Sequence, residues 1–287
     1  MKVGGSLSRG LRYFASLSKL PQTLMLVFTA FIGYVTPHGH LNPAALSILL
    51  VSEFLAISGT TSINMYHDRD IDALMGRTKS RPLPSGSIRP REALALGYVL
   101  LFSGLAISVL DGLLLTLTII LGYAFDIWVY TVMLKRRSSL NIIFGGIAGA
   151  MPILGGWVAR TGSFAVGGVV LSLLILLWIP LHTWVITLVH KEDYTRAGIP
   201  MVPLRAGVGR LFVYLFFALA AFFFATFELA VIGLTTWLMP TLSGVMIAAL
   251  LSMLYAAFFL GRGRLLRPSQ MLADVFLMVS LLSLLLR

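Results

Sequence analysis

The chain has 287 residues, of which 58% are hydrophobic and 11% charged, and its formal net charge is +11. A mean hydropathy of +0.92 excludes an ordinary water-soluble globule, and the length leaves room for several membrane spans of about 20 residues each. The absence of cysteine excludes disulfides and thiolate metal sites. We therefore predict an all-α polytopic membrane protein.

The first 19 residues carry four cations, Lys2, Arg9, Arg12 and Lys19, without an apolar core or a small-residue cleavage site. Because a signal peptide needs both of these features, we expect a retained basic cytoplasmic arm instead. Residues 20–287 are then expected to form a single transmembrane domain.

Apolar runs separated by polar or Gly/Pro-rich breaks predict about nine spans. The eighth is the hardest to delimit, because the long apolar stretch 229–260 is interrupted by Pro240. The expected spans cover residues 20–36, 43–64, 92–110, 113–133, 141–160, 166–189, 209–227, 236–260 and 269–286.

The distribution of cations orients this bundle. All lysines and arginines except Arg160 and Arg287 fall in the N-terminal arm or in connections on the same side as that arm. Basic connections stay in the cytoplasm, so we expect a multi-pass protein of the cell (plasma) membrane whose N-terminus and basic loops are cytoplasmic. Topology and anionic lipid headgroups explain the positive charge, and no nucleic-acid partner is predicted.

The most informative polar pattern lies at the end of the second apolar run, where Asn64, Asp68 and Asp72 are spaced four residues apart. On a helix this spacing places the three side chains on one face, with Asp70 pointing elsewhere. Such oxygen ligands suit Mg2+, which takes one or two carboxylates and completes its octahedron with waters and substrate phosphates. The pattern predicts a metal site.

Three cations follow this pattern directly: Arg77, Lys79 and Arg81. They can meet the charge of a phosphate, and arginine offers a bidentate fork. A metal site followed by cations predicts a diphosphate site. For any single residue an ordinary cytoplasmic loop with solvated charges is an equal alternative, but the ordered combination favours the diphosphate site.

Two other polar segments are expected on the same side of the membrane. Asp193, in the connection after the sixth span, is a candidate for a further metal carboxylate, with a capped helix end as the alternative. Tyr130, Lys135 and Arg136 offer further contacts for phosphate, with anchoring by the positive-inside rule as the alternative for the two cations.

Ionisable side chains inside the expected spans are costly in lipid, so they should face a cavity or a partner. Glu53 lies about three helical turns before Asn64 and on roughly the same face, which makes it a candidate for the far end of a pocket. A structural pairing is an equal alternative. Asp126 is under the same constraint, while Asp274 in the last span is too isolated to assign.

These residues also carry a family resemblance. Asn64-x3-Asp68-x3-Asp72, followed by Arg77-Thr-x2-Arg81-Pro-Leu-Pro, resembles the first aspartate motif of the UbiA-type intramembrane prenyltransferase superfamily. The segments Trp178-x-Pro180-x-His182 and Asp193-Tyr194 resemble its haem branch, the protohaem IX farnesyltransferases or haem O synthases. The resemblance runs from about residue 20 to 210. Val189 stands four before Asp193, so the second aspartate pair of the quinone-type branch is absent, as in the haem branch.

The resemblance implies nine transmembrane helices around a central cavity closed by cytoplasmic loops. It also implies Mg2+-dependent transfer of a farnesyl or longer group from a prenyl diphosphate to a vinyl group of protohaem IX, giving haem O. In that branch, water quenches the resulting cation to leave a hydroxyalkyl side chain, so haem is a substrate. The expected partners are these two substrates, the lipid bilayer and an enzyme of the haem pathway.

The site residues divide into three groups. Asn64, Asp68, Asp72 and Asp193 are the candidate catalytic metal ligands, and the five cations with Tyr130 are the candidate diphosphate ligands. We assign His182, Glu53 and Trp184 to the acceptor pocket. His182 could ligate or orient the haem, since imidazole is a common haem ligand, with a hydrogen-bonded cavity histidine as the alternative.

Two other function classes stay open. A prenyltransferase for a quinone precursor or a glyceryl phosphate lipid shares the first motif but should have the paired second aspartates, which are missing here. A transporter or channel is expected to contain internal repeats, and the sequence contains no convincing repeat.

Overall fold

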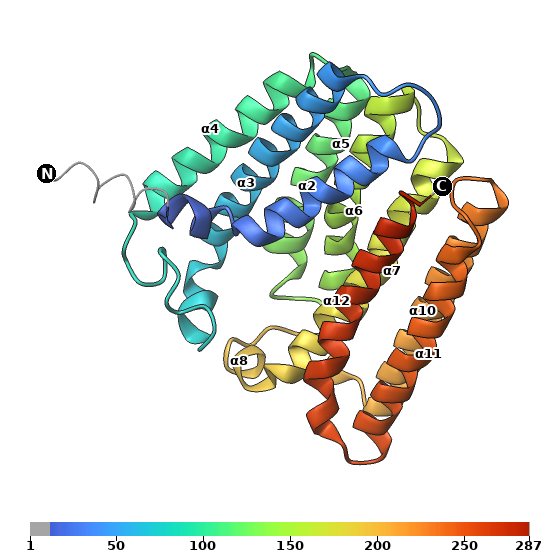
Figure 1. Cartoon of the computed structure of the whole chain (residues 1–287). Helices are drawn as coiled ribbons and strands as arrows, with labels where there is room; N and C mark the ends of the chain where they lie inside the picture. Colours follow the sequence, from blue (N-terminus) through green and yellow to red (C-terminus); the bar gives the residue numbers. More distant parts are fainter. Residues whose placement is uncertain (1–11, 287) are drawn as a thin grey trace, which may run out of the picture.

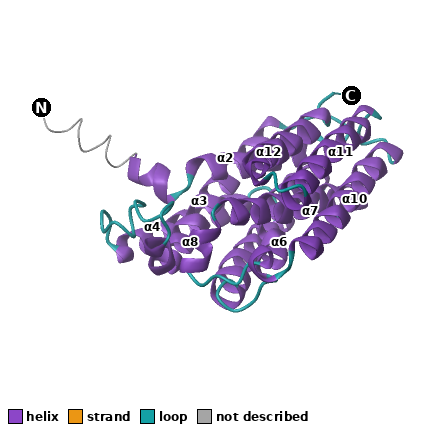
Figure 2. Cartoon of the chain, turned by 90° about the horizontal axis from the view of Figure 1, so that it is seen from below, coloured by secondary structure: helices purple, strands orange, loops and turns teal. Residues whose placement is uncertain are grey.

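The computed structural model describes residues 12–286, and every regular element in that range is helical (Figures 1 and 2). The predicted arm is therefore described only in part, because Lys2 and Arg9 lie outside the described residues. The helices are α2 (Leu20–Val35), α3 (Pro43–Leu74), α4 (Pro90–Ser108), α5 (Leu113–Tyr123) with its π-helical continuation η1 (Ala124–Leu134), α6 (Asn141–Thr161), α7 (Val166–Val189), α8 (Lys191–Arg196), α9 (Val202–Arg205), α10 (Val208–Val231), α11 (Leu238–Phe259), η2 (Gly263–Leu265) and α12 (Leu266–Ser283).

Within the described residues, eight helices are long and apolar enough to cross a bilayer, with α5 and η1 forming one of them and η2 joined to α12. Helix α2 is also apolar but has only 16 residues. Since α2 coincides with the first predicted span, the prediction of about nine spans is close to this count. The all-α polytopic architecture is confirmed.

Helix α3 is the longest element, with 32 residues. It begins cleanly because the Asn42 side chain accepts hydrogen bonds from the backbone N–H groups of Ala44 (3.0 Å) and Ala45 (3.3 Å), with Pro43 in the first turn. It ends at Leu74, ten residues beyond the expected end of the second span. One rigid helix therefore carries the whole Asn64–Asp72 pattern out of the apolar core.

Close backbone approach joins α2 to α6. A Cβ atom added to Gly156 would lie 1.9 Å from the Ala30 carbonyl oxygen, and one added to Gly33 would lie 2.0 Å from the Ile153 carbonyl oxygen. Glycine is therefore required at both positions for the helices to touch, as is common between membrane helices. This contact fixes α2 against the rest of the bundle. It also fixes the position of Lys19, the residue directly before α2.

The bundle has two main apolar cores. One is formed mainly by α2 to α5, and the larger one by α6, α7 and α10 to α12. At one end of the bundle, α8 lies beside the segment that connects α3 to α4 (Figure 1). The cationic connections and the end of α3 meet there.

Candidate active site

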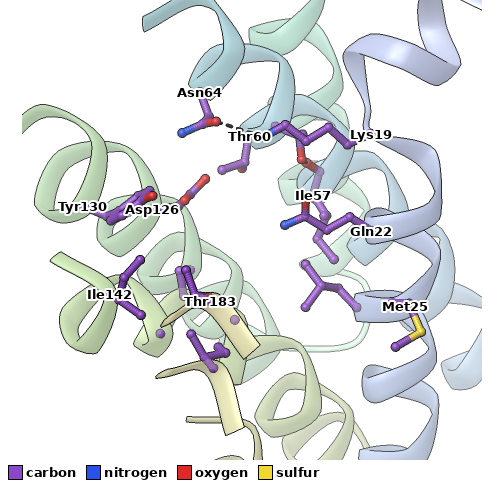
Figure 3. Close-up of a pocket in the computed structure, with 18 of the residues that line it drawn as sticks. Lys19, Gln22, Met25, Ile57, Thr60, Asn64, Asp126, Tyr130, Ile142 and Thr183 are labelled. Carbon is purple, nitrogen blue, oxygen red and sulfur yellow. Dashed lines mark hydrogen bonds between the residues drawn. The ribbon is translucent and has the colours of Figure 1, made fainter. Parts of the chain in front are cut away.

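A cavity of about 670 Å3 opens between the helices. Its volume falls in the range of small-molecule sites, about 300–1,000 Å3. Figure 3 shows Lys19, Asn64, Asp126 and Tyr130 around one part of its wall, with apolar side chains such as Ile142 further along. Nine residues assigned from the sequence line it: Glu53, Asn64, Asp68, Asp72, Arg77, Arg81, Tyr130, Lys135 and His182.

The polar face of α3 forms one side of the cavity. Asn64, Asp68 and Asp72 lie on it in successive turns and are only 4–5% exposed. Asp70 points away from the cavity, where its carboxylate accepts two hydrogen bonds of 2.7 Å from Arg136. We call Asn64, Asp68 and Asp72 the ladder.

Each member of the ladder is paired with a cation. Arg81 Nη1 lies 2.7 Å from Asp72 Oδ2, and Lys135 forms an ion pair with Asp68. Lys19 Nζ donates to Asn64 Oδ1 at 3.1 Å. These cations come from three separate segments of the chain, so the ladder is where the segments converge.

The two lysines respond differently to this environment. Burial alone would lower the pKa of Lys135, but Tyr130 and Asp68 outweigh it and raise the pKa, so Lys135 stays a cation. Burial and the neighbouring Arg81 and Lys135 charges lower the pKa of Lys19 to about 8. The cations therefore repel one another despite the carboxylates between them, and an anionic ligand would relieve that repulsion.

The ladder contains one unsatisfied atom that bears on metal binding. Asp68 Oδ1 is buried and has no hydrogen-bond partner within the described residues, which is unfavourable unless a ligand completes it. Two carboxylates and an amide oxygen are suitable oxygen ligands for Mg2+ when waters and phosphates complete its octahedral coordination. The residues thus fit Mg2+. Nowhere in residues 12–286 are three His, Cys, Asp or Glu side chains grouped as a metal site, so substrate phosphates would have to contribute ligands.

Asp193 does not line the cavity that the ladder borders. Its Oδ1 accepts from the Gly76 N–H at 2.9 Å and its Oδ2 from the Arg77 N–H at 3.2 Å. These two hydrogen bonds lower the pKa of the Asp193 carboxyl. The carboxylate fixes α8 to the segment after α3, so its geometry is that of a loop anchor rather than of a fourth ladder ligand.

Three other residues assigned from the sequence also lie outside the cavity lining. Lys79 is exposed, and Arg136 joins the end of η1 to α3 through Asp70 and the His67 carbonyl oxygen (3.0 Å). Trp184 is buried in the apolar core, with its ring 6.5 Å from that of Tyr214 on α10. The structure therefore does not bring these three side chains to the predicted pocket.

A second polar centre lies on α7, about two helical turns before its end at Val189. His182 Nδ1 lies 2.5 Å from Asp274 Oδ1 on α12, and the Trp178 ring stacks on the imidazole with a centroid distance of 4.5 Å. Glu53, on α3, is 3% exposed and lines the cavity about three turns from Asn64.

Several residues at the site were not predicted from the sequence. Lys19, assigned there to the basic arm, lines the cavity with a left-handed backbone (φ 43°), the only positive φ of a non-glycine residue in the described chain. Asn64 Nδ2 donates to Thr131 Oγ1 (2.8 Å), which donates to the Asp126 carbonyl oxygen (2.7 Å) inside the π-helical segment η1. Left-handed residues and π-helices are frequent at functional sites, but neither is visible in a sequence.

A bundle of membrane helices around a cavity, with a cation-paired carboxylate ladder at one end, agrees with the family comparison. Residues 25–281 match the model of the UbiA prenyltransferase family. The chain belongs to that family.

The curated relatives are more specific. A protoheme IX farnesyltransferase of Aeropyrum pernix is 46% identical over 193 residues, which cover 67% of this chain and 64% of that protein. A protoheme IX farnesyltransferase of Archaeoglobus fulgidus is 44% identical over 211 residues, or 74% of each chain. The match therefore spans just under two thirds of the first relative's length and about three quarters of the second's.

Solved structures share the fold at low identity. A digeranylgeranylglyceryl phosphate synthase superposes with a TM-score of 0.79 at 18% identity, covering 96% of this chain and 97% of that one. A UbiA homologue from Archaeoglobus fulgidus, bound to GPP and Mg2+, gives a TM-score of 0.69 at 16% identity, covering 95% and 99%. At these identities the likeness shows the fold alone.

Proposed function

We propose that this protein transfers a prenyl group, farnesyl or longer, from a prenyl diphosphate to a vinyl group of protohaem IX, giving haem O. The observation that carries the proposal is a single cavity with two polar centres: the cation-paired ladder on α3 and the His182–Asp274 pair on α7 and α12. The first suits a diphosphate and the second a porphyrin. The two protoheme IX farnesyltransferase relatives support this acceptor.

The ladder end faces the cytoplasm in this proposal, and the protein lies in the plasma membrane. The positive-inside rule supports this orientation, because all lysines and arginines except Arg160 and Arg287 belong to that side. Prenyl diphosphate then enters from the cytoplasm. An enzyme of the haem pathway as a partner stays a prediction of the sequence.

At the ladder, Asn64, Asp68 and Asp72 would hold Mg2+, as the unpartnered Asp68 Oδ1 suggests. When bound, the metal supplies Lewis-acid stabilisation of the leaving diphosphate. Arg81 and Lys135 then bind phosphate oxygens directly, and their charge stabilises the negative charge that develops as the carbon–oxygen bond breaks. When the substrate binds, contacts of these two cations with Asp72 and Asp68 are partly replaced by contacts with the phosphate.

The rest of the cavity protects the reacting carbon. The diphosphate leaves with the electron pair of the broken bond, and the allylic cation must meet the vinyl group before it meets water. Apolar side chains such as Met25, Ile57 and Ile142 line the same cavity (Figure 3). After the vinyl π electrons form the new carbon–carbon bond, water adds to the porphyrin side-chain cation and releases a proton.

Membranes that contain the protein provide the test of this function. We expect them to consume farnesyl diphosphate only when both protohaem and Mg2+ are supplied, and EDTA to stop the consumption. Membranes with Asp68→Asn serve as the matched control. Consumption that is independent of haem, but dependent on a quinone precursor or a glyceryl phosphate lipid, would move the protein to another branch of the family.

Alanine at Arg77, Arg81 or Lys135 is expected to weaken prenyl diphosphate binding by roughly 10–100-fold, since each removes a charge-assisted hydrogen bond of about 1.5–3 kcal/mol. Arg81→Lys should restore the affinity only in part, because the bidentate fork is lost. Isothermal titration with a non-hydrolysable prenyl diphosphate analogue measures this. Arg89→Ala is the control, because Arg89 is 86% exposed in the same connection. Unchanged affinity in all three variants would make these cations topology anchors only.

Asp193→Ala separates loop anchoring from metal binding. Loss of both hydrogen bonds to Gly76 and Arg77 should speed hydrogen–deuterium exchange in residues 75–82 even without Mg2+, and should weaken diphosphate binding about tenfold. Glu192→Gln, an exposed neighbour, should leave exchange unchanged. Normal exchange combined with a raised Mg2+ requirement would instead restore Asp193 as a metal ligand.

A further inference from the structure

The His182–Asp274 pair is a feature that the diphosphate chemistry does not use. It joins two helices that lie 92 residues apart in sequence, with 2.5 Å between His182 Nδ1 and Asp274 Oδ1. Both residues line the cavity, and their side chains are 29% and 41% exposed. Ionisable groups inside a membrane bundle are costly, so such a pair is a candidate for function rather than for packing alone.

A second contact holds the imidazole in place. Trp178, one turn before His182, stacks on it with a 25° angle between the rings. The indole Nε1 of Trp178 donates to the Ala273 carbonyl oxygen at 2.8 Å, directly beside Asp274. Two hydrogen bonds, Trp178–Ala273 and His182–Asp274, therefore join α7 and α12 at the same level. The Trp178 stack and the Asp274 hydrogen bond together fix the plane of the imidazole.

The geometry also defines which ring nitrogen is available. A carboxylate accepts a hydrogen bond, so in the neutral imidazole the proton is on Nδ1 and the lone pair is on Nε2. Within the described part of the chain, no hydrogen bond to His182 Nε2 is present, while the residue itself borders the cavity. A histidine beside a cavity that donates one ring N–H to a carboxylate, and whose other nitrogen has no hydrogen bond from the described residues, has the usual arrangement of a metal-binding imidazole.

We propose that Asp274 is a positioning residue that sets His182 to bind the iron of the acceptor haem through Nε2, with Trp178 holding the imidazole plane. This inference rests on the proposed function, because the iron belongs to the porphyrin substrate. The carboxylate makes the imidazole a stronger donor to iron. The bond to iron fixes the porphyrin at α7 and α12. Its vinyl-bearing edge can then point along the cavity toward the ladder.

Haem binding to the purified full-length protein tests the inference without relying on turnover. Ferric protohaem bound to the wild type should give the spectrum of a histidine-ligated haem, and His182→Gly should lose that ligand. Added imidazole should restore the signal, because it can occupy the space left by the side chain. Restoration by imidazole distinguishes ligation from a structural role.

Asp274→Asn tests the positioning role itself. It should weaken haem binding by roughly 10–100-fold, as losses of outer hydrogen bonds to metal ligands do. It should also lower the iron–histidine stretching frequency of the ferrous form and raise the haem reduction potential, while prenyl diphosphate affinity stays unchanged. Asp274→Glu should recover part of both changes. Asp111→Asn is the matched control, since Asp111 lies outside the cavity lining.

The outcomes separate the inference from the function on which it rests. If the wild type binds and converts haem but His182→Gly and Asp274→Asn keep its spectrum and potential, the iron–His182 assignment is wrong and the function stands. If the wild type neither binds nor converts haem, both fall. Where Asp274→Asn does not fold, the glutamate variant and the imidazole-restored His182→Gly still decide the question.

Discussion

Asp68→Asn and Asp72→Asn are each expected to lower prenyl transfer by about 10³-fold or more, while the protein stays folded in the membrane. Each substitution removes a carboxylate that holds the metal and organises the cations, and loss of several kcal/mol of transition-state stabilisation corresponds to this factor. Asparagine preserves the shape of the side chain, so the partly buried Lys135 and Arg81 keep a polar neighbour. Turnover of labelled farnesyl diphosphate with haem in nanodiscs measures the effect.

Asp70→Asn provides the control for the ladder. Asp70 lies on the same helix but turns away from the cavity toward Arg136, so its loss should change turnover by no more than a few-fold. Thermal unfolding should be similar in all three variants. Near-normal turnover in both ladder variants would contradict the assignment of the ladder to metal and diphosphate binding.

His182→Ala is expected to lower haem conversion by roughly 100-fold while the affinity for prenyl diphosphate changes only a few-fold. The reason is the separation of the two centres: the contacts of His182 are with Asp274 and Trp178, and those of the ladder are with Lys19, Arg81 and Lys135. A titration with the diphosphate analogue and a haem-conversion assay on the same preparation measure both quantities.

His190→Ala is the control for this substitution. His190 follows the end of α7 and does not line the cavity, so both haem conversion and diphosphate affinity should be retained. A parallel loss of both properties in His182→Ala would mean that the histidine supports the bundle as a whole. Unchanged haem conversion would remove His182 from the acceptor pocket.

The apolar runs predicted the helices well because hydropathy alone marks a segment that can cross a bilayer. The spacing of Asn64, Asp68 and Asp72 likewise predicted one face, since a helix places residues four apart side by side. The extent of α3 could not be read in the same way. Its last ten residues are polar on the side that faces cations. The apolar run from which the span was predicted therefore stops before the helix ends.

Contacts between segments that are far apart in the chain could not be predicted from the sequence. Lys19 meets Asn64 across 45 residues and His182 meets Asp274 across 92, and only packing of whole helices decides such pairs. Asp193 was ambiguous for another reason: its partners are backbone N–H groups, which every residue except proline carries. Trp184 lies on a helix that is apolar on most sides, so its sequence does not indicate which face borders the cavity.

The central claim is best tested by the product that the purified protein makes from protohaem IX, farnesyl diphosphate and Mg2+ in water enriched in 18O. We predict that mass spectrometry finds haem carrying one farnesyl group and one 18O atom on a former vinyl group, with one diphosphate released per haem converted. Unchanged haem, together with prenylation of a quinone precursor or a glyceryl phosphate lipid in a parallel incubation, would contradict this account.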